Sequence, residues 1–359
     1  MTTVIIGAGA IGGSLGAHLI RAGHDVLLVD NAANHVAAIR ESGLRLEGRE
    51  DFTVRGHAVT PDRLADALGG VAPETVVLTV KAQHTVDALR PVRPLLGARS
   101  VVLSMQNGLN PHEVVASVGP GRTLAACINS MAADYLAPGR ILFGGPGTIR
   151  LGELDGPITP RVERLVALLR ATYVANTQAT NNVWGHLWGK EAYGAWLFAT
   201  AISGEPIADV LDAVENRSML ANLAAEVIAV AEAEGVRCEA VDGFVPDAVR
   251  FGMPRNGEAV RRSLAEMAAL NRRSHKPRSG IWRDLAVRKR ATEVDAQLGI
   301  VVELGARHGI AVPLVARLVA IIHALERQDR AMGTANLAEL RSADADAYAK
   351  ERRGFSSSR

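Results

Sequence analysis

The chain opens with a short apolar strand that runs into a glycine-rich turn and then into a helical pattern, and this arrangement constrains the fold more than any other feature. Residues 4–6 are apolar and β-branched, as a strand inside a parallel sheet requires. Apolar residues then recur at helical spacing through residues 11–22. In the intervening G-x-G-x-x-G motif, Gly7 permits a tight turn, Gly9 lets the backbone approach a pyrophosphate, and Gly12 lets the helix pack closely on the strand. The sequence therefore predicts a dinucleotide-binding unit with the phosphates at the N-terminus of the first helix.

The composition is that of a globular chain, since 48% of the 359 residues are hydrophobic and 22% are charged. The net charge of +2 gives no case for nucleic-acid binding, and no apolar run reaches the roughly 18 residues of a membrane-spanning helix. The cysteines, Cys127 and Cys238, are far apart, which argues against a disulfide scaffold or a cysteine metal site, and we expect no bound metal. We expect a cytoplasmic protein, because the cysteine usage fits a reducing compartment and the first strand leaves no room for a signal peptide.

The first half of the chain alternates short apolar strands with helical stretches, which predicts a mostly parallel sheet covered on both faces. The further strands are expected at residues 25–29, 76–80, 100–105 and 123–128, with a hairpin over 138–151 that closes the sheet. Helical periodicity dominates from about residue 183, with helices expected at 218–235, 294–309 and 313–328. We therefore expect an α/β Rossmann domain over residues 1–180, an all-α substrate and dimerisation domain over 181–335, and a charged tail over 336–359, loosely ordered from Ser342.

The second predicted strand ends at an acidic residue, Asp30, followed by Asn31. A carboxylate about 20 residues beyond the glycines accepts hydrogen bonds from the adenosine ribose 2′-OH and would repel a 2′-phosphate. No arginine or lysine follows until Arg40, so the sequence favours NAD over NADP. The alternative is that Asp30 caps the next helix.

Five short segments carry a resemblance to a known family. They are V-K-A at residues 80–82, Q-N-G-L at 106–109, W-G-K at 188–190, T-E-V-D at 292–295 and G-I-A-V-P at 309–313. In this order, the set resembles the ketopantoate reductase family over nearly the whole chain. The resemblance implies a Rossmann domain joined to a helical domain of the 6-phosphogluconate-dehydrogenase-like type, with the active site in the cleft between them.

The resemblance also implies roles for individual residues. Lys190 corresponds to the catalytic lysine, and Glu293 to a glutamate that binds the substrate hydroxyl and supports catalysis. Asn107 and Lys81 correspond to residues that line the cofactor and substrate side. The chemistry is consistent, because reduction of a ketone leaves an alkoxide to which a nearby lysine ammonium can donate a proton. The expected catalytic residues are Lys190, Glu293 and Asn107, and the expected cofactor contacts are Gly7, Gly9, Ala10, Ile11, Gly12, Asp30, Asn31, Lys81 and Asn107.

Each of these residues also has a structural interpretation. Lys190 alone fits a solvated lysine near the start of a helix. The dipeptide at Asn107 is common in turns. Glu293 suits a helix N-terminus, with Thr292 as the cap.

Two positions on the predicted helix that carries Lys190 depart from the family pattern. The family has asparagines four and eight residues after its lysine, and both help to hold the substrate, whereas this chain has Gly194 and Phe198. A hydrogen atom and an apolar ring cannot form these hydrogen bonds, and Gly194 leaves room for a bulkier substituent. We therefore expect a substrate other than ketopantoate.

The family's serine-rich element, near the substrate carboxylate, corresponds to a segment in which either Ser279 or Gly280 matches the substrate serine. Arg283 and Arg278 are candidates for an acidic substrate, since arginine suits bidentate carboxylate binding. The alternative for this basic region is solvated surface and ion pairs, for example with Asp284. The basic region includes Arg272, Arg273, Lys276, Arg278, Arg283 and Arg288. Taken together, the candidate substrate contacts in the chain are Gly194, Phe198, Ser279, Gly280 and Arg283.

The leading hypothesis is a nicotinamide-dependent oxidoreductase that transfers a hydride between NAD and a 2-oxo or 2-hydroxy acid, or a related polar ketone or alcohol. Three alternatives stay open: a true NADPH-dependent 2-dehydropantoate 2-reductase, an opine- or imine-forming reductase, and a non-catalytic dinucleotide-binding redox sensor. We expect a small anionic substrate and a homodimer, and neither nucleic acid nor a membrane as partner.

Overall fold

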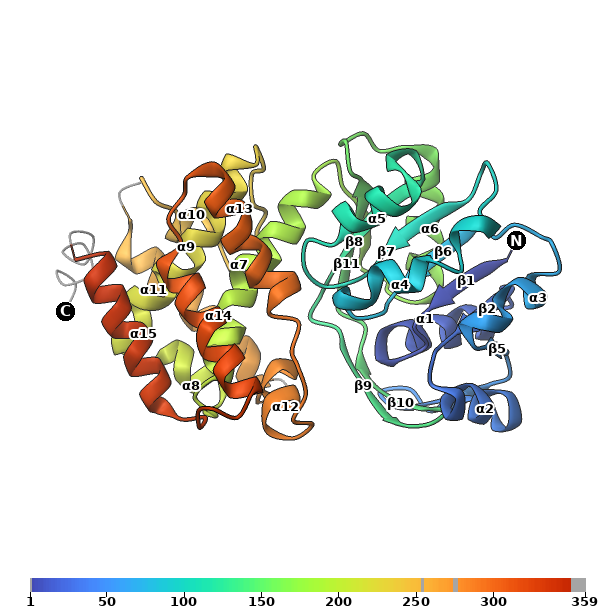
Figure 1. The fold of residues 1–359 in the computed structure, drawn as a ribbon, viewed down its shortest axis with the longest axis horizontal. Coiled ribbons are helices and arrows are strands. Elements are labelled where there is room, and N and C mark those ends of the chain that lie inside the picture. Colours follow the sequence, from blue (N-terminus) through green and yellow to red (C-terminus); the bar gives the residue numbers. More distant parts are fainter. Residues whose placement is uncertain (1, 253–254, 274–276, 350–359) are drawn as a thin grey trace. The chain divides into compact units, whose positions relative to one another are not determined.

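The computed structural model describes residues 2–252, 255–273 and 277–349. The chain forms two compact units, Met1–Val183 and Trp184–Arg359 (Figure 1), where the sequence predicted a boundary after residue 180. Within the described residues, no helix has the length and apolar character needed to cross a membrane.

The first unit is built on an eight-stranded sheet in the order β12-β11-β8-β7-β6-β1-β2-β5. Neighbouring strands are parallel except β8 and β11, which are antiparallel. This arrangement confirms the predicted mostly parallel Rossmann sheet. The strands are β1 Thr3–Ile6, β2 Val26–Val29, β5 His57–Val59, β6 Thr75–Leu78, β7 Val101–Ser104, β8 Thr123–Asn129, β11 Thr148–Glu153 and β12 Thr177–Ala179.

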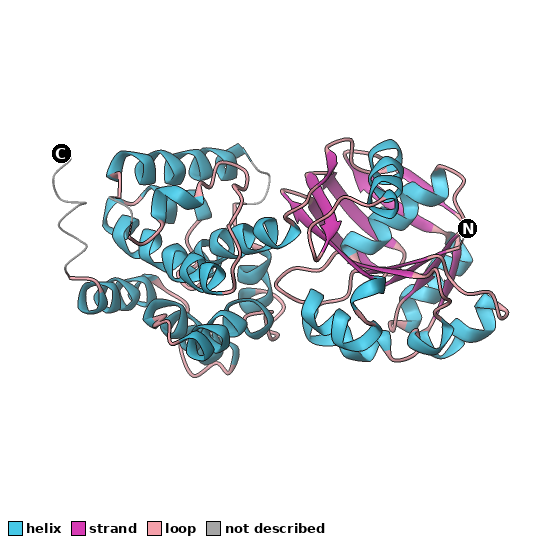
Figure 2. Ribbon diagram, turned by 90° about the horizontal axis from the view of Figure 1, so that it is seen from above, coloured by secondary structure: helices cyan, strands magenta, loops and turns pink. Residues whose placement is uncertain are grey.

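Helices cover both faces of this sheet, and Figure 2 shows them in cyan on either side of the magenta strands. Val4 and Ile6 of β1 belong to one buried cluster, together with Leu89 and Val114 from covering helices. Ile5, between them, belongs to the opposite cluster. Burial on both faces explains why the central strands are continuous apolar runs. The helices are α1 Ala10–Arg21, α2 Ala33–Ser42, α3 Leu64–Leu68, α4 Thr85–Leu89, α5 Pro111–Val118 and α6 Pro160–Thr172, with 3₁₀ turns η1 Pro61–Arg63, η2 Ala82–His84, η3 Arg93–Leu95 and η4 Pro120–Arg122.

A second, four-stranded sheet in this unit differs from the sequence prediction. Its order is β4-β3-β10-β9, with β3 Leu44–Gly48, β4 Phe52–Val54, β9 Ala132–Ala137 and β10 Arg140–Gly145. The expected hairpin over residues 138–151 is wrong, because β10 pairs with β9 and β3 whereas β11 returns to the main sheet. Helix α1 packs against all four strands of the second sheet, so these strands bury the face of α1 that the main sheet leaves uncovered.

The second unit is all-helical, as predicted, and α9 is its central element. Helix α9 is buried along most of its length and packs against α8, α10, α11, α13, α14 and α15. The indole Nε1 of Trp196 on α7 donates a hydrogen bond to the carbonyl oxygen of Leu220 on α9, at 2.7 Å. The helices are α7 Val183–Ala201, α8 Ile207–Asp212, α9 Arg217–Ala233, α10 Pro246–Val249, α11 Gly257–Arg273, α12 Gly280–Ala286, α13 Ile300–His308, α14 Pro313–Glu326 and α15 Thr334–Ala347, with the 3₁₀ turn η5 Val214–Asn216 and the π-helix η6 Asp295–Gly299.

The predicted C-terminal tail requires a correction. Residues 336–347 lie in α15, which packs on α9 and α14 instead of forming a loose tail. Leu337 and Leu340 are buried, and the buried carboxylate of Asp344 accepts a hydrogen bond from Asn222 Nδ2 at 2.5 Å. Two leucines three residues apart provide the apolar stripe that the charged composition of this region obscured. Residues 350–359 lie outside the described part of the chain.

A buried glutamate, Glu226 of α9, holds the first turn of α14. Its carboxylate oxygens accept hydrogen bonds from the backbone N–H groups of Leu314 and Val315 at 2.9 and 2.8 Å, and Tyr348 Oη donates a third at 2.7 Å. The first N–H groups of a helix have no intrahelical acceptor, and the helix dipole also favours an anion there. Glu226 therefore satisfies groups that would otherwise be buried without partners.

We expect the Glu226→Leu substitution to lower the free energy of unfolding by about 3 kcal/mol, because two buried N–H groups lose their acceptor. Urea unfolding followed by circular dichroism measures this loss. The surface variant Glu303→Gln, whose exposed carboxylate pairs with Arg307 one turn away, should change stability by less than about 0.5 kcal/mol. Equal stability of Glu226→Leu and the control would show that Glu226 does not stabilise the first turn of α14.

The same carboxyl should make stability depend on pH. Burial raises the pKa of Glu226 from 4.5 to about 7, against the hydrogen bonds that lower it. Because the folded-state pKa lies above the unfolded-state value, this contribution to stability is complete below the unfolded pKa and is lost as the pH rises through the folded pKa. Between these two pKa values, the free energy of unfolding should therefore change less with pH for Glu226→Gln than for the wild type.

Candidate functional site

The glycine-rich turn lies at the carboxyl end of β1, and each glycine of the motif meets a different steric requirement. Gly7 has φ +96°, and a Cβ there would lie 2.9 Å from the backbone nitrogen of Val80. A Cβ on Gly12 would lie 2.1 Å from the Gly7 carbonyl oxygen and 2.2 Å from Thr79 Oγ1. A Cβ on Gly9 would meet nothing within 4 Å in the described part of the chain. The turn is therefore tightly packed at Gly7 and Gly12, and open at Gly9.

This open side coincides with the start of α1. Gly9 is the N-cap residue and makes no side-chain capping bond, and the first turn contains no acidic residue. The first backbone N–H groups of a helix, here those of Ala10, Ile11 and Gly12, have no intrahelical acceptors and favour an anion. The geometry fits a pyrophosphate that approaches Gly9 and accepts from these groups.

The other predicted cofactor residues follow strands at the same edge of the sheet. Because β2, β1, β6 and β7 are parallel neighbours, their carboxyl ends are adjacent. Asp30 follows β2, Lys81 follows β6 by three residues, and Asn107 follows β7 by three residues. The chain order reverses between β1 and β6, which is the position where open α/β sheets bind ligands.

Asp30 does not cap α2, the alternative that the sequence left open, because Ala32 is the N-cap residue and no side chain forms a capping hydrogen bond there. Its Oδ1 accepts a hydrogen bond from the backbone N–H of Ala32 at 2.9 Å, just before α2. Asn31, next to it, is exposed. A carboxylate has a second oxygen, so this bond leaves acceptor capacity for a ribose hydroxyl.

Two residues that sequence reasoning missed support the turn. Thr79 Oγ1 lies 2.7 Å from the Gly7 carbonyl oxygen, to which it donates. The buried ring of His35 lies between two backbone groups, with Nε2 at 2.9 Å from the Ala8 carbonyl oxygen and Nδ1 accepting from Gly139 N–H at 2.9 Å. The sequence could have indicated Thr79, which lies two residues before Lys81, but nothing in the sequence connects His35 with Ala8.

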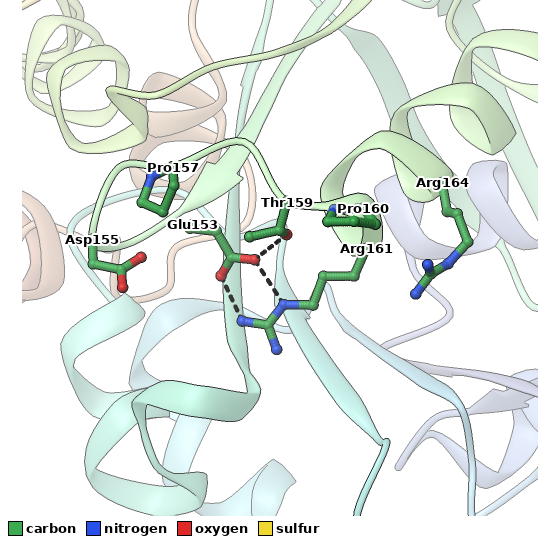
Figure 3. Close-up of a pocket in the computed structure, with 7 residues that line it drawn as sticks. All are labelled: Glu153, Asp155, Pro157, Thr159, Pro160, Arg161 and Arg164. Carbon is green, nitrogen blue, oxygen red and sulfur yellow. Dashed lines mark hydrogen bonds and ion pairs between the residues drawn. The ribbon is translucent and has the colours of Figure 1, made fainter.

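A separate hollow of about 400 Å³ in the first unit lies at the opposite edge of the sheet (Figure 3). Glu153 ends β11 and pairs with Leu124 at the start of β8, so this edge is where the parallel strands begin. The carboxylate of Glu153 accepts from Thr159 Oγ1 at 2.5 Å and from Arg161 Nε at 2.7 Å, which ties β11 to α6. Since ligands of open α/β sheets bind at the carboxyl ends of the strands, we assign this hollow a structural role.

In the second unit, Lys190 lies near the middle of α7, directly after a glycine that is closely packed. A Cβ on Gly189 would lie 2.0 Å from the carbonyl oxygen of Glu239, and Glu239 N–H donates to the Gly185 carbonyl at 2.9 Å. Because the backbone at Glu239 approaches α7 so closely, only glycine fits at position 189, directly before Lys190. Lys190 itself is half-buried.

Glu293 lies just before an irregular helix. The predicted helix over residues 294–309 is in fact split into the π-helix η6 and α13, and π-turns are frequent at functional sites. Thr292 is held by Glu326, whose Oε1 accepts from both Thr292 N–H and Oγ1 at 2.7 Å. The Thr292 hydroxyl oxygen accepts from Val294 N–H at 3.2 Å, but Val294 is itself the N-cap residue of η6, so Thr292 lies ahead of the helix and is not its cap. These contacts fix the backbone on both sides of Glu293.

The structure brings Lys190 and Glu293 together around a residue that sequence reasoning missed, Glu191. Burial raises the pKa of Glu191 from 4.5 to about 8, Lys190 lowers it and Glu293 raises it further. Both charges therefore act on the same buried carboxyl. The sequence signal for Glu191 was weak, because a glutamate within a helix is common.

The remaining candidate substrate residues differ in burial, since Phe198 and Ser279 are buried, Arg283 is half-buried and Gly280 is exposed. Phe198 is 0% exposed, so the expectation that its ring contacts a substrate is corrected: it packs in the interior of the helical unit. Ser279 caps α12, its hydroxyl oxygen accepting from Trp282 N–H at 3.2 Å. Gly280, the first residue of α12, is exposed, and Arg283 on the same helix is half-buried.

The basic region around α12 shows the ion pairs that the sequence offered as an alternative. Asp284 Oδ1 lies 3.3 Å from Arg288 Nη1 and 2.9 Å from Arg290 Nη2. Arg278 Nε donates to the Gly204 carbonyl at 2.7 Å, and its guanidinium lies 4.9 Å from the ring of Trp282. Arg278 thus orders the backbone around α12. Lys276 lies outside the described residues.

Comparisons with known proteins assign both units to one family. The family profile described as "Ketopantoate reductase PanE/ApbA" matches residues 3–156, and "Ketopantoate reductase PanE/ApbA C terminal" matches residues 182–326. The chain is 30% identical to a 2-dehydropantoate 2-reductase of Pyrococcus abyssi over 232 residues, which cover 64% of this chain and 71% of that one. It is 25% identical to a 2-dehydropantoate 2-reductase of Streptococcus pyogenes serotype M3 over 91% of this chain and 98% of that one. The crystal structure of a PanE/ApbA family ketopantoate reductase from Ralstonia eutropha JMP134 is similar with a TM-score of 0.75 and 28% identity, covering 91% of this chain and 99% of that one.

Proposed function

Because the chain belongs to the ketopantoate reductase family and is an oxidoreductase acting on CH–OH groups with a nicotinamide cofactor, we propose that it interconverts a 2-oxo acid and a 2-hydroxy acid other than ketopantoate and pantoate, with NAD. The observation that carries the proposal is the group formed by Lys190, Glu191 and Glu293 beside Gly194, since it combines a proton donor with an unfilled position. A substrate bulkier than ketopantoate, or one with different polar groups, fits that position.

The cofactor would be held by the first unit. The N–H groups at the start of α1 would bind the pyrophosphate, and Gly9 offers the space for it. The Asp30 carboxylate at the end of β2 would accept from the ribose 2′-OH and repel a 2′-phosphate. This is the basis for NAD over NADP.

Lys190 would perform the proton transfer. When bound, the nicotinamide supplies or accepts the hydride at the reacting carbon. In the reducing direction, the Lys190 ammonium polarises the carbonyl and donates its proton to the alkoxide oxygen. In the oxidising direction, neutral Lys190 accepts the hydroxyl proton. Glu293 would accept a hydrogen bond from the substrate hydroxyl and orient it.

A second candidate is the activity for which the curated relatives are named, reduction of 2-dehydropantoate. The two candidates make different demands on the position of Gly194. The family's asparagine at that position helps to hold its substrate, and Gly194 cannot form that hydrogen bond with pantoate, whereas a substrate with a different polar group could use the space beside Gly194.

Steady-state absorbance at the reduced-nicotinamide band tests the proposal. NAD and NADP are compared in parallel over a panel of 2-hydroxy acids that includes pantoate, with Lys190→Ala as control. Turnover with NAD on a substrate other than pantoate, lost in the variant, is the expected result. Efficient turnover of pantoate with NADP, above every other pair, would overturn it in favour of the second candidate. NADH oxidation that requires an added amine and a 2-oxo acid would indicate an opine-type reductase.

Cofactor preference should change when the charge of Asp30 is removed. Asparagine can still accept the hydrogen bond from Ala32 N–H, but it does not repel a 2′-phosphate. We expect Asp30→Asn to raise NADPH affinity relative to NADH by about tenfold, measured by nicotinamide fluorescence. Asp25→Asn, at the other end of β2, is the matched control and should leave the ratio unchanged. The same ratio in Asp30→Asn and the wild type would remove Asp30 from cofactor selection.

A further inference from the structure

A carboxyl oxygen of Glu191, beside Lys190, is buried without a partner among the residues that the structure describes. Glu191 is 3% exposed, and its Oε1 has no hydrogen bond within the described residues. Buried polar atoms in native proteins are almost always paired, so an exception at a proton-transfer site calls for a ligand that completes it. The proton transfer that we propose for Lys190 does not use the carboxyl group of Glu191, so that group is available for another role.

The space beside Gly194 shows where that ligand would lie. A Cβ built on Gly194 would have Glu191 Oε1 at 3.8 Å and Gln297 Oε1 at 3.9 Å as its nearest neighbours in the described structure. Glu191 precedes Gly194 by three residues on α7, so the two share a helix face. Gln297 comes from η6, where its N–H donates to the Glu293 carbonyl at 3.1 Å. Two oxygens from different elements therefore converge on one unfilled position.

We propose that Glu191 and Gln297 bind an amino substituent of the substrate in the space beside Gly194. The inference rests on the proposed 2-hydroxy acid oxidoreductase function and adds the substrate class, an amino-substituted 2-oxo or 2-hydroxy acid. An ammonium group has only donors, and it matches a site in which both facing atoms are oxygens. The glycine is required because any side chain at 194 would occupy the volume of the ligand.

Charge also favours this ligand. The charged groups acting on Glu191 are Lys190 on its own helix and Glu293 ahead of η6. Burial keeps the Glu191 carboxyl protonated at neutral pH, with its pKa raised to about 8. A bound ammonium group would lower the pKa of Glu191 and favour its ionised form. The Glu191 proton would then be released to the solvent as the cation binds.

Calorimetric titration of the enzyme–NADH complex tests the site without turnover, because a 2-hydroxy acid cannot react with the reduced cofactor. The probes are 4-amino-2-hydroxybutanoate, 2,4-dihydroxybutanoate and 2-hydroxypentanoate, which differ only in the terminal group. We expect the amino probe to bind at least tenfold tighter than either of the others, and to release protons, seen as a dependence of the heat on the buffer.

Two variants locate the effect. Glu191→Gln retains the volume but cannot ionise, and it should lose both the tenfold preference and the proton release. Gly194→Ala introduces a methyl group at ordinary contact distances, and it should weaken binding of the amino probe by at least tenfold without impairing folding. Glu303→Gln, at an exposed position of α13, is the control and should behave as the wild type.

Equal affinity for the three probes, tighter binding of the hydroxyl probe, or an amino preference that persists in Glu191→Gln would each overturn the inference. Failure of the proposed function is a separate result. If none of the probes is oxidised with NAD or NADP while the amino preference holds and depends on Glu191, the amino site stands and the proposed reaction is wrong.

Discussion

Lys190→Ala should lower kcat by about a thousandfold or more, because general acid–base catalysis alone contributes about 10²–10⁴ and the ammonium also stabilises the developing alkoxide. The affinity for NADH should remain within about threefold of the wild type, since the cofactor contacts assigned above lie in the first unit. Steady-state absorbance with saturating amounts of the best substrate of the panel measures kcat, and fluorescence titration measures the affinity for NADH.

A second substitution separates proton transfer from charge. Lys190→Arg keeps the positive charge, but arginine does not deprotonate in proteins, so it should not restore activity in the oxidising direction. Lys289→Ala, at an exposed residue after α12, is the matched lysine control. Full activity of Lys190→Ala would exclude Lys190 as the acid–base group. A change of oligomeric state with no change in turnover would favour the non-catalytic sensor.

Gly12→Ala should disrupt the first unit more than any other single methyl group in the motif. The added Cβ would lie 2.1 Å from the Gly7 carbonyl oxygen and 2.2 Å from Thr79 Oγ1, and both belong to the hydrogen-bonded turn. Neither atom is the end of a flexible side chain, so α1 must move away from β1. Overpacking of this kind costs about 1–3 kcal/mol and sometimes more, and we expect the upper end of that range. Thermal unfolding should shift down by roughly 5–10 °C.

Gly9→Ala provides the matched comparison, because the two glycines lie in the same motif. A Cβ on Gly9 meets no described atom within 4 Å, so folding should be nearly unchanged. The methyl group would nevertheless occupy the side on which the pyrophosphate approaches, and NADH affinity should fall by at least tenfold. Loss of stability in Gly9→Ala, or normal stability and binding in Gly12→Ala, would contradict the roles that we assign to these glycines.

The parts of the fold that sequence predicted well are those in which neighbouring residues determine the structure. The β1 strand, the turn at Gly7 and the start of α1 are encoded within twenty residues, because strand burial, positive φ and helix capping are local requirements. The same holds for the parallel order of the main sheet, which follows from alternating strands and helices.

Long-range packing accounts for what sequence reasoning missed or misplaced. Strands β3 and β10 pair although almost a hundred residues separate them, and no local pattern distinguishes that pairing from a hairpin with β11. The order of α15 depends on Leu337 and Leu340 being covered by other helices. The burial of Phe198 likewise depends on which face of α7 turns inward, so an apolar ring predicted at the substrate belongs to the core.

The sequence by itself determined the two-unit plan, the glycine-rich turn after β1 and the family, because those depend on local motifs and on their order along the chain. Only the tertiary structure decided the environment of Glu191. Among the described residues, one oxygen of Glu191 has no partner, and the oxygen of Gln297 lies close by because α7 and η6, about a hundred residues apart in the chain, come near each other at Gly194. A carboxyl group acquires its protonation state and its ligand from such surroundings, and those surroundings exist only once the chain has folded.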